Sequence, residues 1–195
     1  MSSRTLGLIA ILCSPLLCID FFVNGLIPDF SPYALSSVFN LLYTLGWMCG
    51  IAGLLQLRAA GNNKTGRGIL ITQLALLSLS IIYNIYEIVN PGSATFSYKT
   101  LQLFWPLSNF FMIATGATVV IANTLQGWKK FIPLVVGLWL PVTFVVLRVM
   151  FGRNDLILIL SSFYSVVAWF LLGLSVYKSP RTVAAETATV SLAYA

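Results

Sequence analysis

The feature that most constrains this chain is a series of six apolar stretches, each about as long as a helix that crosses a lipid bilayer. A helix rises 1.5 Å per residue, so about 20 residues span the hydrocarbon core. The stretches cover residues 5–27, 33–57, 68–90, 101–125, 131–150 and 155–177. The sequence therefore predicts an all-α polytopic membrane protein, with a six-helix bundle in residues 1–178 and a cytoplasmic tail in residues 179–195.

Composition excludes the common soluble classes. Of the 195 residues, 58% are hydrophobic and 8% are charged, and the mean hydropathy is +0.92. Soluble domains carry about 25% charged residues. A soluble enzyme, a disordered protein and a nucleic-acid-binding domain are excluded. The formal net charge of +6 does not indicate nucleic-acid binding, because the basic residues lie at the ends of the apolar stretches.

Several chemistries are excluded by residues that the chain lacks. There is no histidine, which removes histidine-ligated zinc or haem and any catalytic serine–histidine or cysteine–histidine pair. Cys13, Cys18 and Cys49 lie in apolar runs without a CxxC pair. We therefore expect no metal and no cofactor. The sequence does not decide whether the protein is an enzyme, but it favours a protein without enzymatic activity.

Lysine and arginine are distributed unequally between the two sets of helix ends. One set carries eight: Arg4, Arg58, Lys64, Arg67, Lys129, Lys130, Lys178 and Arg181. The other carries three: Lys99, Arg148 and Arg153. The positive-inside rule then places both termini in the cytoplasm, in the inner membrane if the source is bacterial. The glycosylation sequon Asn63-Lys64-Thr65 falls on the cytoplasmic side, so we expect it to be unmodified.

A similar pentapeptide occurs in the second, fourth and sixth stretches. These segments read LSSVF at 35–39, LSNFF at 107–111 and LSSFY at 160–164. Two interpretations are open: three tandem helical hairpins, or chance similarity, because these residues are common in membrane helices.

Polar side chains concentrate in the outer half of the predicted bundle. A charge at the centre of a membrane helix costs about 2.5–3.5 kcal/mol on insertion scales. Asp20 is the deepest charge, and Asn24 lies one helical turn further on the same face. We expect an outward-facing polar cavity that binds or transports a small solute, cation or proton, with Asp20 at its floor. Its expected lining is Asp20, Asn24, Asn40, Asn84, Glu87, Asn109 and Arg148.

A structural interpretation of the same residues stands beside this one. Asparagine side chains often bond neighbouring membrane helices, at about 0.6 kcal/mol each on average. Glu87 and Arg148 could lie at the level of the headgroups, where a charged side chain costs little free energy. Asp20 could make a structural hydrogen bond or an ion pair with Arg148.

Small and irregular residues predict how the helices pack. Gly46 and Gly50 form a GxxxG pattern that Gly53 extends, which is typical of close helix packing within or between chains. Pro141 lies in the middle of a stretch and predicts a bend. Three tryptophans lie mid-span and could either pack in the core or line a pocket: Trp47, Trp139 and Trp169.

Three functions are compatible with these features. The first is a membrane protein that binds or transports a solute through the polar cavity. The second is an accessory or structural subunit of a larger membrane complex, or a homo-oligomer, joined through the glycine face. The third is an intramembrane enzyme that acts on a lipid or isoprenoid, with Asp20 and Glu87 as acid and base. The expected partners are the bilayer, a small solute or lipid ligand, and a complex partner.

Overall fold

The computed structural model describes residues 1–26, 33–93, 95–152 and 155–179; side chains are described for these except 24–26, 33–34, 145–148, 151, 155 and 158. Within these ranges the chain is almost entirely helical, with no strand. The helices are α1 (Ser3–Cys13), α2 (Leu16–Leu26), α3 (Tyr33–Gln56), α4 (Lys64–Val89), α5 (Phe96–Gln102), α6 (Phe104–Ala122), α7 (Ile132–Leu140), α8 (Arg148–Phe151) and α9 (Asp155–Tyr177). A 3₁₀ turn, η1 (Gly127–Phe131), precedes α7, and a π-helix, η2 (Pro141–Leu147), joins α7 to α8.

Five helical stretches in the described chain are long and apolar enough to cross a membrane. They are Ser3–Val23, Leu35–Gln56, Lys64–Val89, Phe96–Ala122 and Ile159–Tyr177. Each falls on one of the six stretches that the sequence predicted. The remaining one, residues 131–150, contains α7, η2 and α8, where the π-helix divides the α-helix.

The distribution of side chains also fits a lipid environment. Polar side chains such as Gln73, Ser108 and Thr115 are completely buried, with relative exposures of 0%. Large apolar side chains cover the outside instead; Ile121 is 83% exposed and Phe163 is 68% exposed. Such a surface is unfavourable in water and ordinary against lipid tails. These features support an integral membrane location.

Prolines explain where the expected helices break. Pro15 lacks an N–H and would clash with the Ile11 carbonyl one turn earlier. That carbonyl accepts hydrogen bonds from the backbone N–H and the Oγ of Ser14, at 3.2 and 2.8 Å. The stretch 5–27, expected as one helix, is therefore two helices, α1 and α2.

Pro141 interrupts its helix in a different way. It begins the π-helix, so the irregularity predicted there takes the form of a wider helical turn. The Thr143 hydroxyl donates to the Trp139 carbonyl at 2.7 Å and so satisfies a backbone acceptor near the irregular turns.

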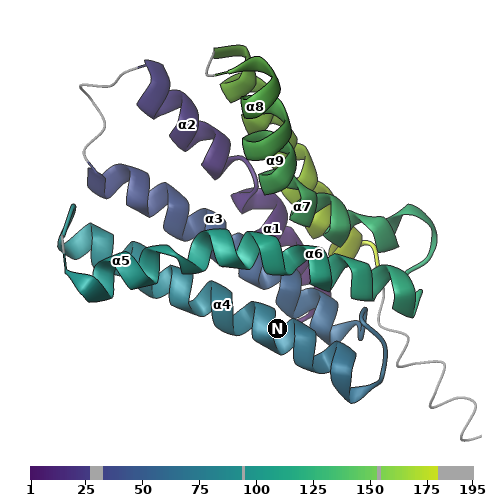
Figure 1. The fold of residues 1–195 in the computed structure, drawn as a ribbon. Coiled ribbons are helices and arrows are strands. Elements are labelled where there is room, and N and C mark those ends of the chain that lie inside the picture. Colours follow the sequence, from purple (N-terminus) through teal and green to yellow (C-terminus); the bar gives the residue numbers. More distant parts are fainter. Residues whose placement is uncertain (27–32, 94, 153–154, 180–195) are drawn as a thin grey trace, which may run out of the picture.

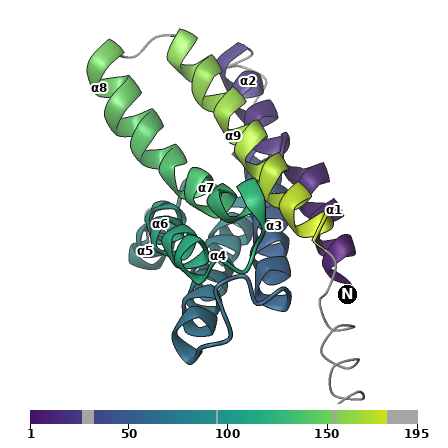
Figure 2. The same ribbon diagram turned by 90° about the vertical axis from the view of Figure 1, so that its right-hand side faces the viewer.

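The long helices form a closed ring (Figures 1 and 2). Successive helices pack in the order α1, α3, α4, α6, α7 and α9, and α9 packs back against α1. Figure 2 shows α9 lying beside α1, with α7 and α8 forming the neighbouring arm of the ring. α2 continues beyond the Pro15 break and contacts α3 and α9.

Glycines allow the closest crossings in this ring. A methyl group on Gly7 of α1 would lie 2.8 Å from the Gly173 carbonyl oxygen of α9. A methyl group on Gly137 of α7 would lie 2.6 Å from the Ile113 backbone nitrogen of α6. In both cases the obstacle is backbone, so a larger residue would force the helices apart.

The glycine stripe singled out in the sequence lies inside the ring. Gly46 packs against Cys13 of α1, whereas Gly50 and Gly53 pack against Leu172 and Val176 of α9. The stripe is thus covered within the chain.

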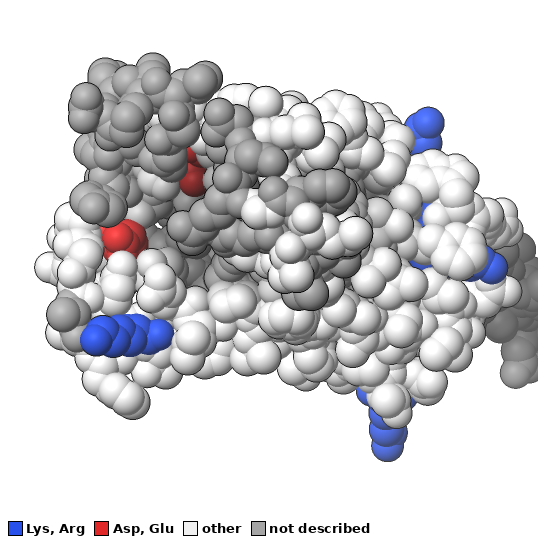
Figure 3. Space-filling model, turned by 45° about the horizontal axis from the view of Figure 1, so that its top comes forward, with Lys and Arg blue, Asp and Glu red and all other residues white. Residues whose placement is uncertain are grey.

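Two loops, the end of α9 and the start of the chain meet at one end of the bundle. The Thr124 hydroxyl donates to the Ala59 carbonyl at 2.6 Å, which joins the α3–α4 loop to the α6–α7 loop. Lys129 donates through Nζ to the Lys178 carbonyl at 3.0 Å, and Gln56 donates through Nε2 to the Met1 carbonyl at 3.3 Å. In Figure 3 most of the visible basic side chains lie toward one end and the visible acidic ones toward the other.

Candidate functional site

A pocket of about 280 Å³ lies toward the acidic end of the bundle, among α2, α3, α4, α5 and α6. It is lined by Leu17, Asp20, Phe21, Ser36, Ser37, Asn40, Tyr83, Asn84, Glu87, Gln102 and Trp105. We call it the acidic pocket. Helices from the first four predicted spans contribute to it, so only the folded bundle assembles this set of side chains.

Asp20 enters the acidic pocket from α2 and is 4% exposed. Asn40 of α3 donates from Nδ2 to the Asp20 Oδ2 at 3.0 Å. The same Nδ2 donates to the Ser36 carbonyl at 3.0 Å, which fixes the orientation of the amide. Asp20 is therefore held in place by an amide that is itself anchored to its own helix.

Glu87 enters from the last turn of α4 and is 8% exposed. Its Oε1 accepts a long hydrogen bond of 3.4 Å from the Gly92 N–H, whereas its Oε2 is buried with no hydrogen-bond partner among the described residues. A buried oxygen without a partner carries a desolvation cost of about 1–3 kcal/mol, more when charged. Glu87 is therefore packed inside the bundle near the C-terminal end of α4 and does not lie on its outer surface.

The described lining residues supply carboxylates, amides, hydroxyls and aromatic rings, with no lysine or arginine among them. Tyr83 lines the pocket, and its hydroxyl lies 3.2 Å from the hydroxyl of Tyr98 on α5. In the part of the chain that the structure describes, no group of three His, Cys, Asp or Glu residues could hold a metal ion. The described lining thus combines two carboxyl groups with apolar walls.

Four of the seven predicted cavity residues line this pocket together: Asp20, Asn40, Asn84 and Glu87. Asn109 is outside its lining; it is fully buried and donates to the Trp105 carbonyl at 2.9 Å, and its Oδ1 has no partner in the part of the chain that the structure describes. The side chains of Asn24 and Arg148 lie outside the described residues, as does the proposed Asp20–Arg148 ion pair.

Sequence reasoning missed the other residues of the lining. Ser36 lies one turn before Asn40, and Tyr83 is one turn before Glu87, so helical spacing from the predicted residues could have found both. Gln102 gave no such signal. It ends α5 at the break before α6, whereas the sequence predicted an unbroken helix over 101–125.

The mid-span tryptophans pack with one another and do not line the pocket. The rings of Trp47 and Trp169 lie 5.3 Å apart edge to face, and those of Trp169 and Trp139 lie 5.7 Å apart. Trp105, which does line the pocket, continues this series at 5.9 Å from Trp139. Trp139 also donates through Nε1 to the Ser161 carbonyl at 3.0 Å. The aromatic core thereby supports one wall of the acidic pocket.

Comparisons with protein-family models, curated proteins and solved structures find no match for this chain. We therefore infer the function from the geometry and chemistry of the pocket.

Proposed function

We propose that this protein binds a small cationic solute, of the alkylammonium type, in the acidic pocket, as the binding step of transport across the membrane. The observation that carries the proposal is the burial of Asp20 and Glu87 in one pocket, where Glu87 Oε2 has no hydrogen-bond partner among the described residues and the described lining includes no lysine or arginine. A buried carboxylate in a medium of low dielectric is costly unless a cation or hydrogen-bond donors offset its charge.

The remaining walls favour an organic cation over a bare metal ion. Trp105 and Tyr83 present aromatic rings, which attract ammonium groups through their π-faces. Asn84 and Gln102 supply amide oxygens that can accept N–H groups of a ligand. Leu17 and Phe21 provide apolar surface for the carbon atoms that such a ligand carries.

We further propose six membrane spans, with both termini in the cytoplasm. The segment from Ile132 to Phe151 is the sixth, because α7, η2 and α8 follow one another directly and α7 packs in the ring between α6 and α9. In this orientation the loops rich in lysine and arginine face the cytoplasm and the acidic pocket opens to the outside.

Asn63 lies at the start of α4, at the basic end of the bundle. Its Oδ1 accepts a hydrogen bond from the Gly66 N–H at 2.7 Å, so the amide caps the start of α4.

The glycine face does not favour the complex-subunit alternative. That proposal used Gly46, Gly50 and Gly53 as a contact for a partner, but α1 and α9 cover all three.

Calorimetric titration of the purified protein in lipid nanodiscs tests the binding proposal. The probes are choline and ethanolammonium, with potassium as the inorganic cation and glucose as the neutral solute. We expect an organic cation to bind, and Asp20→Asn and Glu87→Gln each to weaken it by about tenfold or more, since losing a buried charged partner costs about 2–5 kcal/mol.

Lys99→Gln is the matched control, because Lys99 lies at the same end of the bundle but outside the pocket lining. We expect it to retain the affinity of the wild type. Failure of the wild type to bind any of the cations, or equal affinity in a folded Asp20→Asn protein, would refute the proposal.

A further inference from the structure

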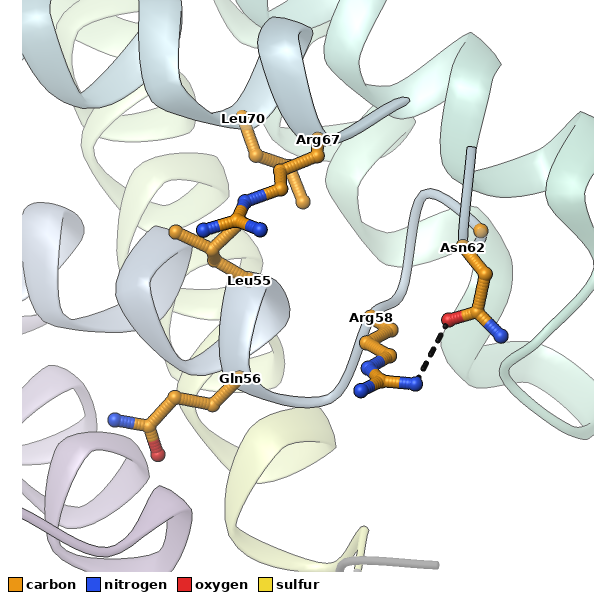
Figure 4. Close-up of a pocket in the computed structure, with 7 residues that line it drawn as sticks. Leu55, Gln56, Arg58, Asn62, Arg67 and Leu70 are labelled. Atoms are coloured by element: carbon orange, nitrogen blue, oxygen red, sulfur yellow. Dashed lines mark hydrogen bonds between the residues drawn. The ribbon is translucent and has the colours of Figure 1, made fainter. Parts of the chain in front are cut away.

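A second concave site lies at the opposite, basic end of the bundle (Figure 4). It is a cleft of about 170 Å³ at the junction of α3 and α4. Its lining consists of Leu55, Gln56, Arg58, Gly61, Asn62, Arg67 and Leu70. We call it the arginine cleft. It shares no residue with the acidic pocket.

The backbone holds Arg58 in an uncommon conformation. Its φ is +53°, in the left-handed region where glycine is the usual residue after a helix. The turn is closed by the Ala59 N–H, which donates to the Leu54 carbonyl at 2.9 Å. The Arg58 guanidinium donates to the Asn62 Oδ1 at 3.3 Å, so it is directed along the loop that borders the cleft (Figure 4).

Arg67 reaches the same cleft from the first turns of α4 (Figure 4). No acidic residue contributes to the lining. Asp20 and Glu87, the acidic side chains that the structure describes, line the acidic pocket instead. Two guanidinium groups thus border one cleft, and neither has a carboxylate partner among the described residues.

We propose that the arginine cleft binds a phosphate group. Guanidinium forks match phosphate oxygens geometrically and form charge-assisted hydrogen bonds with them. Leu55 and Leu70 give the cleft an apolar wall beside its charges. The phosphate can come from the headgroup of an anionic lipid, which the basic end meets in the cytoplasmic leaflet, or from a soluble phosphate compound.

General attraction between the basic end and anionic lipids would not depend on this cleft. A control must therefore remove equal charge from the same end but outside the lining. Arg4 and Lys64 are both exposed there and contribute nothing to the cleft. The test compares two double variants. The first carries Arg58→Gln and Arg67→Gln in the cleft, and the second carries Arg4→Gln and Lys64→Gln outside it.

The test measures lipid and phosphate binding to the full-length protein in a neutral detergent, by native mass spectrometry and thermal unfolding. Phosphatidylglycerol in micelles with phosphatidylcholine is the lipid probe, and inorganic phosphate is the soluble probe. We expect the wild type to bind at least one of them, and the Arg58/Arg67 variant to lose about tenfold or more in affinity. The Arg4/Lys64 variant should stay close to the wild type.

The two probes separate the sources of the phosphate. Binding of phosphatidylglycerol that inorganic phosphate does not displace supports a headgroup site, and displacement supports a site for soluble phosphate. Equal losses in the two double variants, or no binding of either probe to the wild type, would overturn the proposal. Arg67→Gln alone and Arg58→Gly, which relieves the left-handed backbone, provide variants that fold if Arg58→Gln does not.

Discussion

At the scale of single residues, the two carboxylates of the acidic pocket differ in how they are held. Asp20 accepts a hydrogen bond from Asn40, whose amide is also bonded to its own helix. Glu87 keeps one oxygen, Oε2, without a partner among the described residues. We infer that Asp20 is positioned before a ligand arrives and that Glu87 Oε2 gains its partner when the ligand binds.

Asn40→Ala tests this division of roles. It removes the amide that joins α2 to α3, so we expect a loss of about 1–3 kcal/mol in the free energy of unfolding. We also expect weaker binding of the organic cation, because Asp20 is then less well positioned. Calorimetry on Asn40→Ala, Asp20→Asn and the double variant should show non-additive losses. Additive losses in binding would show that Asn40 does not act through Asp20.

At the scale of helices, the ring depends on close contact between backbones. Gly7 and Gly173 bring α1 and α9 together, and a methyl group on Gly173 would lie 2.8 Å from the Ile11 backbone nitrogen. Gly68 of α4 has open space around it, with no atom within 4 Å of an added methyl group. The same substitution at these two glycines should therefore have opposite effects.

We expect Gly173→Ala to destabilise the protein by about 1–3 kcal/mol, because the two helices must move apart. Gly68→Ala should stabilise it by up to about 1 kcal/mol, since alanine is the better helix former. Thermal unfolding of the variants in one detergent measures both. A neutral Gly173→Ala variant would mean that the crossing of α1 and α9 is looser than described.

The sequence predicted the helices better than their interruptions. Apolar length located the five helical stretches of the described chain that are long and apolar enough to cross a membrane. However, α4 begins at Lys64, ahead of the predicted residue 68, because Asn63 caps a polar first turn. The break at Pro15 was missed, since the hydropathy of 5–27 is continuous across it. The close approach of Gly7 to Gly173 could not be predicted, because it joins the first and last predicted spans and exists only once α9 packs against α1.

At the scale of the whole molecule, the two candidate sites lie toward opposite ends of the bundle. The sequence predicted that polar residues of one bilayer half form a cavity. Four of these residues share a pocket: Asp20, Asn40, Asn84 and Glu87. The prediction also included Asn109, which is buried outside the lining. Depth along the membrane follows from sequence position, but the direction in which a helix faces follows from packing. The tandem-hairpin repeat stays a prediction.

The orientation can be tested with single cysteines in a chain whose three native cysteines are replaced by alanine. A membrane-impermeant maleimide should label Ser93→Cys, in the turn between α4 and α5, in intact cells. Lys64→Cys, at the start of α4, should be labelled only after the membrane is made permeable. The reverse pattern would invert the proposed topology and place the arginine cleft outside.

The proposed function requires that the acidic pocket is open to water from outside and attracts cations. Its most direct test is the reaction of Ser37→Cys, in the same cysteine-free chain, with thiosulfonate reagents of opposite charge. Ser37 lines the pocket and is 5% exposed, whereas its neighbour Val38 lies on the outer surface and is 36% exposed. Val38→Cys is therefore the matched control for reaction at the lipid-facing surface.

We predict that Ser37→Cys reacts faster with the trimethylammonium reagent than with the sulfonate reagent when they are added from outside, and that choline slows the reaction. Val38→Cys should show neither the charge preference nor the protection. A Ser37→Cys protein that is unreactive, or that reacts equally with both reagents and is not protected, would contradict the proposed cation pocket.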